Sequence, residues 1–171
     1  MVSLNFLLKL VVIGGFVSSV ALHASEKTMQ ACIRSSAGSD LWKCLDRENG
    51  VLKKEQRRLL STLNTELTAC RINWVGYHPE RALVELKLAQ KNWDAFAIHD
   101  CSYGTETFGQ GSAAGSSALQ CHMAHLRTRN ARLSQILQEV LSTRQMLIDW
   151  DREQQYLNQQ NHQKFVECPG K

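Results

Sequence analysis

Leucines at helical spacing follow one another along residues 41–67. Successive members lie four or seven residues apart, which places them on one face of an α-helix, and charged residues fall on the other faces. This pattern predicts a helix that begins at Asp40 and ends near Cys70, with Ser39 or Asp40 as its N-cap. The leucine stripe consists of Leu41, Leu45, Leu52, Leu59, Leu63 and Leu67.

Two further helical stretches follow a break that contains Gly76 and Pro79. Pro79 suits the first position of a helix, because its missing N–H would be unpaired there in any case. The second stretch has the stripe Leu83, Leu86, Gln90, Trp93, Ala97 and Cys101, broadened by Ala82, Ala89 and Phe96. The third predicts a long helix to about Tyr156, with the stripe Leu119, Met123, Leu126, Asn130, Leu133, Leu137, Val140, Arg144 and Leu147.

Between the second and third stretches, residues 102–117 interleave four glycines with serine and alanine. This is the composition of a flexible loop. No strand-period alternation of convincing length occurs anywhere in the chain. The sequence therefore predicts an all-α fold: a small, disulfide-stapled antiparallel bundle of about three helices, with a Gly/Ser-rich loop between helices two and three.

The first 24 residues have the pattern of an export signal. Lys9 gives a positive end, residues 10–22 are mostly apolar, and small residues lead to Ala24. The apolar stretch is shorter than the roughly 20 residues that a membrane span needs. We expect residues 1–24 to be a signal peptide, 25–160 a helical domain and 161–171 a C-terminal tail. The mature protein would be exported, periplasmic or secreted, without a stable membrane span.

Six cysteines follow this leader, and none lies in a Cys-x-x-Cys motif. An even number of cysteines in an exported chain indicates a disulfide framework. Six cysteines allow 15 pairings, so their positions on the helices must help to choose. Those positions favour Cys101 with Cys121 across the Gly/Ser loop, Cys32 with Cys44, and Cys70 with Cys168, which would tether the tail.

Composition limits the protein to one domain. The chain has 171 residues, of which 43% are hydrophobic, enough for a single modest core. Its net charge of +4 is mild and spread along the sequence. The basic cluster Lys53, Lys54, Arg57 and Arg58 shares its helix with acidic residues, so we interpret it as a solvated face. No nucleic-acid partner is expected.

Three patterns resemble chemical sites, and each has a simpler interpretation. His122 and His125 share one helical face and could hold zinc with His99 or Asp100, but no acidic residue is suitably spaced on the same helix. Residues 109–112 follow a helix instead of a strand and lack the Lys-Ser/Thr of a phosphate-binding loop. Their serine is not in a Gly-x-Ser-x-Gly elbow. We expect no enzyme activity, no metal and no cofactor.

An ordered set of motifs resembles a known exported family. A Gln-x-x-Trp-x-x-aromatic motif precedes a cysteine, followed by a Gly/Ser segment, a second cysteine and an arginine eight residues later. Over residues 32–137 this set is similar to the domain family named after the LprI lysozyme inhibitor. The resemblance implies a periplasmic or surface protein, and the family name implies lysozyme inhibition. The matching residues are Gln90, Trp93, Phe96, Cys101, Cys121 and Arg129, with Cys32 and Cys44 upstream.

These observations predict a non-catalytic binding protein whose disulfide-closed loop contacts a protein partner, with lysozyme (a muramidase) as the expected target. A bond that fixes the loop would lower the entropy lost on binding. The mature chain, which lacks Lys9, has a net charge of +3 and so offers no long-range attraction to a cationic lysozyme. The alternative is an immunity-type or structural partner of an envelope complex, which binds through the long third helix. The loop residues expected to contact the partner are Tyr103, Glu106, Phe108, Gln110 and Ser112.

Overall fold

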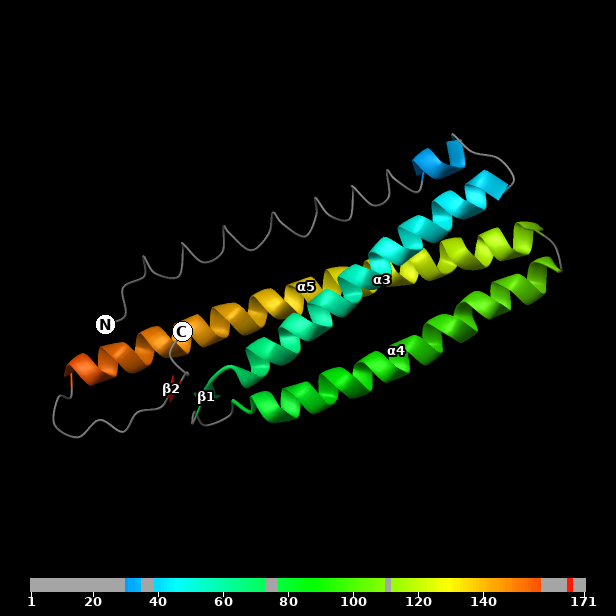
Figure 1. Ribbon diagram of the computed structural model, residues 1–171. Coiled ribbons are helices and arrows are strands. Elements are labelled where there is room, and N and C mark those ends of the chain that lie inside the picture. Colours follow the sequence, from blue (N-terminus) through cyan, green and yellow to red (C-terminus); the bar gives the residue numbers. More distant parts are fainter. Residues whose placement is uncertain (1–29, 35–38, 73–76, 110–111, 158–165, 168–171) are drawn as a thin grey trace, which may run out of the picture.

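Three long helices form the body of the protein. The computed structural model describes residues 30–34, 39–72, 77–109, 112–157 and 166–167. Helix α3 (Ser39–Thr68) crosses α5 (Ser112–Leu157), and α4 (Pro79–Phe108) runs antiparallel to α5, as Figure 1 shows. Two-residue strands β1 (Arg71–Ile72) and β2 (Val166–Glu167) pair in antiparallel register. The predicted all-α fold is confirmed.

Helix α3 buries the predicted leucine stripe except for Leu41, which is half-buried. Leu45, Leu52, Leu59, Leu63 and Leu67 are all buried, and most of them face α5 or α4 in the interior of the bundle. Two polar residues occupy positions in the same stripe, between leucines: Asn49 and Gln56.

The apolar interior has two parts along the bundle axis. One part, the hairpin-half core, lies near the connection between α4 and α5, and the other, the far-half core, lies toward the two strands (Figure 1). The buried members of the hairpin-half core are Cys32, Leu45, Leu52, Leu119, Met123 and Leu126. The buried members of the far-half core are Leu59, Leu63, Leu67, Leu86 and Leu133.

A polar seam of two buried residues separates these cores. Gln56 of α3 lies between Leu52 and Leu59, and Asn130 of α5 lies between Leu126 and Leu133. The Asn130 side-chain amide donates a hydrogen bond of 3.0 Å to the Leu52 carbonyl. This bond links α3 to α5 at the level between the two apolar cores.

Helix α4 begins at Pro79, as predicted, and the His78 carbonyl accepts hydrogen bonds from the amides of Arg81 and Ala82. Leu86, Ala97 and Cys101 of the predicted stripe are buried. The predicted broadening of this stripe is wrong, because Ala82, Ala89 and Phe96 are exposed. Helix α5 ends at Leu157, close to the predicted end.

The predicted flexible loop over residues 102–117 is wrong in its extent. Helix α4 continues to Phe108 and α5 begins at Ser112. The hydroxyls of Ser102, Thr105 and Thr107 each donate to the carbonyl four residues earlier, so these side chains hydrogen-bond within the helix. Gly109 has a φ of 78°, a left-handed conformation that glycine adopts without strain, and it ends α4.

Two of the three predicted disulfides are confirmed. Their Cα–Cα distances are 5.7 Å for Cys32–Cys44 and 5.6 Å for Cys101–Cys121. Cys70 is disulfide-bonded as well, whereas Cys168 lies outside the described residues. The strands pair Arg71, the residue after Cys70, with Glu167, the residue before Cys168 in the sequence. The bond between Cys70 and Cys168, and with it the tethered tail, stays a prediction.

The predicted signal peptide, residues 1–24, lies outside the described residues. Among the helices that are described, none has an apolar stretch long enough to cross a membrane.

Candidate functional site

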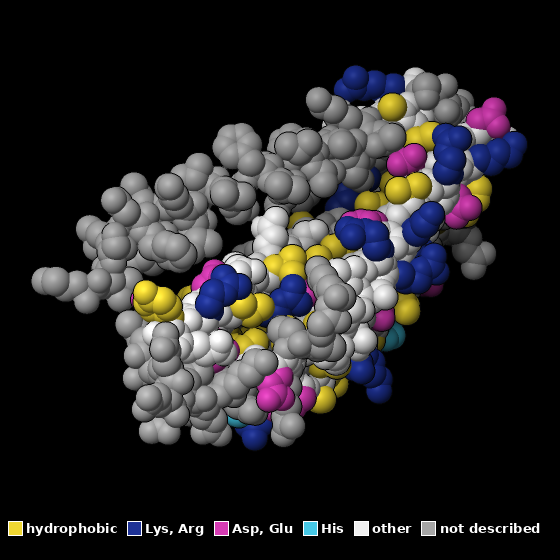
Figure 2. Space-filling view, turned by 60° about the vertical axis from the view of Figure 1, so that its left-hand side comes forward, with side chains coloured by type: hydrophobic (Ala, Val, Ile, Leu, Met, Phe, Trp, Pro, Cys, Tyr) yellow, Lys and Arg dark blue, Asp and Glu magenta, His cyan; other side chains and the backbone are white. Residues whose placement is uncertain are grey.

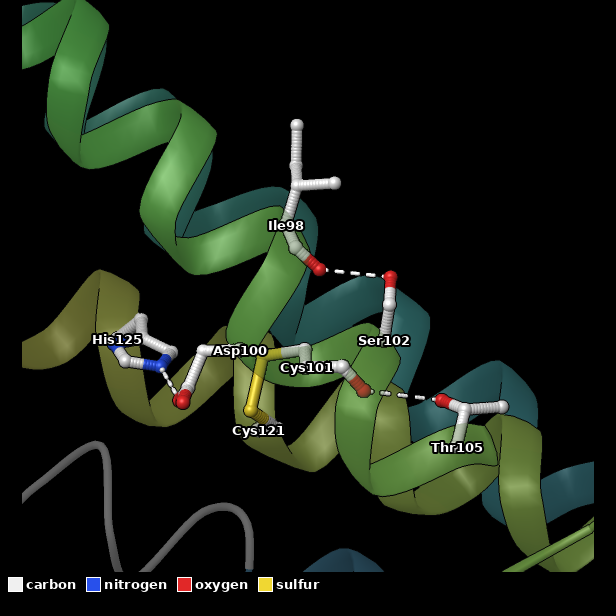
Figure 3. Close-up of a disulfide and its surroundings, with 7 residues drawn as sticks. All are labelled: Ile98, Asp100, Cys101, Ser102, Thr105, Cys121 and His125. Carbon is white, nitrogen blue, oxygen red and sulfur yellow. Dashed lines mark hydrogen bonds and ion pairs between the residues drawn. A yellow bond between two sulfur atoms is a disulfide. The ribbon is translucent and has the colours of Figure 1, made fainter. Parts of the chain in front are cut away.

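The Cys101–Cys121 bond joins α4 to α5 about two helical turns from the connection between them (Figure 3). Cys101 is buried, with 1% of its surface exposed. We call residues 92–109 and 112–126 the hairpin end. Because the bond fixes one helix against the other, the side chains of the hairpin end are held at set positions on rigid elements.

A hydrogen bond between side chains crosses between the same two helices beside the disulfide. The Nε2 atom of His125 lies 2.7 Å from a carboxylate oxygen of Asp100, which is the residue before Cys101 (Figure 3). The His125 ring also meets two aromatic rings of α4 edge to face, with centroid distances of 6.4 Å to Trp93 and 5.4 Å to Phe96. His125 is therefore held by a carboxylate and by two rings, all from α4.

Farther from the connection, a hydrogen bond between Arg129 of α5 and Gln90 of α4 also joins the two helices. Arg129 Nε donates to Gln90 Oε1 at 3.0 Å, and Gln90 Nε2 donates to Asp94 Oδ1 at 2.9 Å. Burial lowers the pKa of the Arg129 guanidinium, against the opposing effect of the Asp94 charge. Gln90, Trp93, Phe96 and Arg129 therefore all contribute to contacts across the α4–α5 interface.

Four of the five residues that were expected to contact a partner lie on helices and not in a loop. Tyr103 and Glu106 are exposed on helix α4, with 75% of the tyrosine surface accessible. Phe108 and Ser112 are the terminal residues of α4 and α5, and their side chains are not described. Gln110 lies outside the described residues. The candidate surface is thus the outer side of a helical hairpin.

Large apolar side chains on this part of α4 are more than half exposed to solvent. Phe96 is 57% exposed and Ile98 is 56% exposed, in addition to Tyr103. The sequence pattern predicts Phe96 in the buried stripe, and this prediction is wrong. Ile98 lies outside that stripe, and nothing in the pattern indicates that it belongs to a binding surface. The hairpin end therefore presents more apolar surface than the pattern predicted.

The hairpin end is also acidic, although the chain as a whole is cationic. Residues 92–126 contain Asp94, Asp100 and Glu106 but no lysine or arginine, whereas the full chain has a net charge of +4. At the start of α3, which lies next to the start of α5, Asp40 is paired with Lys43 at 3.4 Å. Elsewhere charges mix, and Figure 2 shows one face on which Lys and Arg side chains alternate with Asp and Glu side chains. The sequence shows that residues 92–126 lack lysine and arginine. Only the structure shows that these residues lie together at one end of the α4–α5 hairpin.

The side chains considered for a zinc site, and the serine of residues 109–112, are only partly brought together. His125 and Asp100 do lie together, whereas His99 is exposed on α4 and the Ser112 side chain is not described. Burial, Lys53 and His125 lower the pKa of His122, which favours its neutral form. Within the described part of the chain, the ligand-type side chains that gather closely are Cys101, Cys121 and His125, and the two cysteines are bonded to each other.

Comparison of this chain with models of protein families, with curated proteins and with solved structures finds no match. The functional argument therefore rests on the geometry and charge of the hairpin end.

Proposed function

We propose that this is a non-catalytic, exported binding protein that engages a basic protein partner through the hairpin end. The observation that carries the proposal is the exposure of Phe96, Ile98 and Tyr103 on a helix that a disulfide holds in place. Exposed apolar groups rimmed by polar residues are typical of protein-binding surfaces. Aromatic anchors contribute much of the energy of such interfaces.

The local charge supports a basic partner. Residues 92–126 contain three acidic residues and no basic one, which gives this end of α4 a local excess of negative charge and so a negative field. The basic residue of α3 that acts on this end is Lys53, beside His122. Such a field speeds association with a cationic protein and orients it, although the net charge of the whole chain has the opposite sign. Lysozyme-type muramidases are generally cationic, and the motif resemblance points to the same target class.

Rigidity supports the proposal as well. A side chain that is already held on a clamped helix loses less conformational freedom on binding than one on a flexible loop. The Cys101–Cys121 bond and the His125–Asp100 pair both restrain the two helices relative to each other. The disulfides also support export, since such bonds persist in oxidising compartments.

The test is inhibition of bacterial cell-wall lysis, followed as the loss of turbidity with the oxidised protein. We expect inhibition of at least one lysozyme type, and a tenfold or greater loss of inhibition in Ile98→Asp and Tyr103→Ala. Val84→Ala is the matched control, because Val84 is 63% exposed on the same helix outside the hairpin end. Unchanged lysis at a tenfold molar excess, against several lysozyme types, would contradict lysozyme as the target.

A second candidate is a structural or immunity-type partner of an envelope complex that binds through α5. Its support is the exposure of Leu141, Met146 and Tyr156 on the C-terminal half of this helix. Capture of envelope proteins on the immobilised chain separates the two. If α5 binds the partner, Met146→Asp loses it and Tyr103→Ala retains it. The hairpin-end proposal expects the opposite result.

A further inference from the structure

We infer that the hairpin end has a second chemical state, in which Cys101 and Cys121 are reduced and bind a divalent zinc-type cation together with His125. In the structure the two sulfurs and a ring nitrogen of His125 all lie within 4.8 Å of one another. Two thiolates and an imidazole are the ligand types that Zn²⁺ prefers. This site is distinct from the proposed function, which concerns the oxidised protein.

The backbone geometry suits both states. With Zn–S distances of about 2.3 Å and Zn–N distances of about 2.1 Å, the ligand atoms of a tetrahedral site lie roughly 3.3–3.8 Å apart. The Cα atoms of Cys101 and Cys121 are 5.6 Å apart, and His125 lies one helical turn after Cys121. Once the sulfurs are no longer bonded, rotation about their Cα–Cβ bonds separates them by the additional distance. The two helices do not have to move far.

The surroundings of His125 are those of a metal-binding histidine. Asp100 holds Nε2 at 2.7 Å, so Nδ1 is the nitrogen that His125 would offer to a metal while this contact persists. A carboxylate in this position orients a ligating imidazole and raises its basicity. Trp93 and Phe96 pack against the ring from α4 and limit its rotation. The fourth position is open to water or to a further ligand.

The oxidised state is converted to the reduced state by thiol–disulfide exchange. A small-molecule dithiol transfers two electrons and two protons to the Cys101–Cys121 bond, which becomes two thiols while the dithiol becomes a cyclic disulfide. Binding of Zn²⁺ then releases the two thiol protons, because the ligands are thiolates. In the oxidised state neither sulfur is a thiolate, so the metal has no site. Formation of the disulfide therefore expels the cation.

The experiment titrates Co²⁺, a spectroscopic stand-in for Zn²⁺, into the full chain after reduction with a phosphine, which supplies no thiol ligand. We expect the intense visible absorption of tetrahedral cobalt with thiolate ligands, abolished by one equivalent of Zn²⁺. His125→Asn should weaken cobalt binding at least tenfold, and Asp100→Asn roughly tenfold. His122→Asn is the matched control, three residues away on the same helix, and should bind like the unmodified chain.

Two further samples keep the test decisive. The double variant Cys32→Ser with Cys44→Ser should retain the absorption, since these cysteines are not part of the site. Circular dichroism shows whether Zn²⁺ restores helix to any reduced chain that has unfolded, which would also support the site. The inference is overturned if reduced protein gives no tetrahedral spectrum, if His125→Asn leaves the spectrum unchanged, or if oxidised protein binds equally well.

Discussion

The two halves of the bundle are stabilised by different means. The hairpin half holds both described disulfides, and its core includes Cys32 with Cys44 packed against it. The far-half core is made of leucines, with Ile136, Leu137 and Val140 among the side chains that pack against it. An ion pair between Glu66 and Arg144, both half-buried, joins α3 to α5 there.

The two halves also differ in the size of the side chains between their helices. The α4–α5 interface near the connection contains small residues such as Ala97 and Ala114, which are buried but remove little apolar area from water. Covalent links compensate for this, and they leave the outer side of α4 free to expose Phe96 and Tyr103. In the far half, buried leucines fill the space between the three helices, and the disulfide-bonded Cys70 lies at its outer edge. We therefore expect packing variants to act mainly in one half and disulfide variants in the other.

The largest effect is expected from Leu63→Ala in the far-half core. Leu63 is fully buried, so removal of its side chain leaves a cavity and should lower the free energy of unfolding by roughly 2–5 kcal/mol. Urea denaturation of oxidised protein measures it. Val51→Ala on the same helix is the control, because Val51 is 57% exposed and should change stability by less than about 0.5 kcal/mol. A loss below about 1 kcal/mol for Leu63→Ala would contradict a leucine-dependent far half.

The double variant Cys101→Ser with Cys121→Ser should lower the free energy of unfolding by about 3 kcal/mol, given a sequence separation of 20. Hydrogen exchange shows where the loss falls. Amides of residues 92–109 and 112–126 should exchange faster, while amides around Leu59 and Leu133 keep their protection under native conditions. Equal acceleration in both halves would mean that the halves are not separable.

A smaller effect is expected at the seam between the halves. Asn130→Ala removes the hydrogen bond to the Leu52 carbonyl and should lower the free energy of unfolding by about 1–3 kcal/mol. Asn92→Ala tests the same substitution at an exposed helical position, where a change of no more than about 0.5 kcal/mol is expected. If the two variants were equally stable, the seam would have no role in joining α3 to α5.

The smallest effect concerns pH and the hairpin half. Burial, Lys53 and His125 lower the pKa of His122 in the folded state, so the unfolded chain binds its proton more readily. Stability should therefore be highest above about pH 6.5 and fall as the pH drops through the folded-state pKa. Melting temperatures between pH 5 and pH 8 measure this slope. His122→Gln should flatten it, whereas His99→Gln, at an exposed position of α4, should flatten it less.

Local pattern predicted much of the architecture. The spacing of leucines in residues 41–67 predicted α3 and its buried face, and Pro79 marked the start of α4, because helical periodicity and proline geometry act within a few residues. The pairing of Cys101 with Cys121 followed from their places on adjacent helices. Asn130 lies in the predicted stripe of the third helix, so the sequence predicted its burial. The sequence did not predict that its side chain hydrogen-bonds to the Leu52 carbonyl of α3.

The sequence by itself determined which residues can form helices, which of their faces are apolar, and that residues 92–126 lack basic charge. Only the tertiary structure decided that residues 102–108 and 112–117 are helical, because the clamp and the packing of α4 on α5 outweigh the weak local preferences of glycine and serine. It also decided that His125 meets Asp100 and that Phe96 contacts His125 while more than half of its surface stays exposed. Such contacts join residues far apart along the chain, so they depend on how the helices are rotated against each other, which no local pattern specifies.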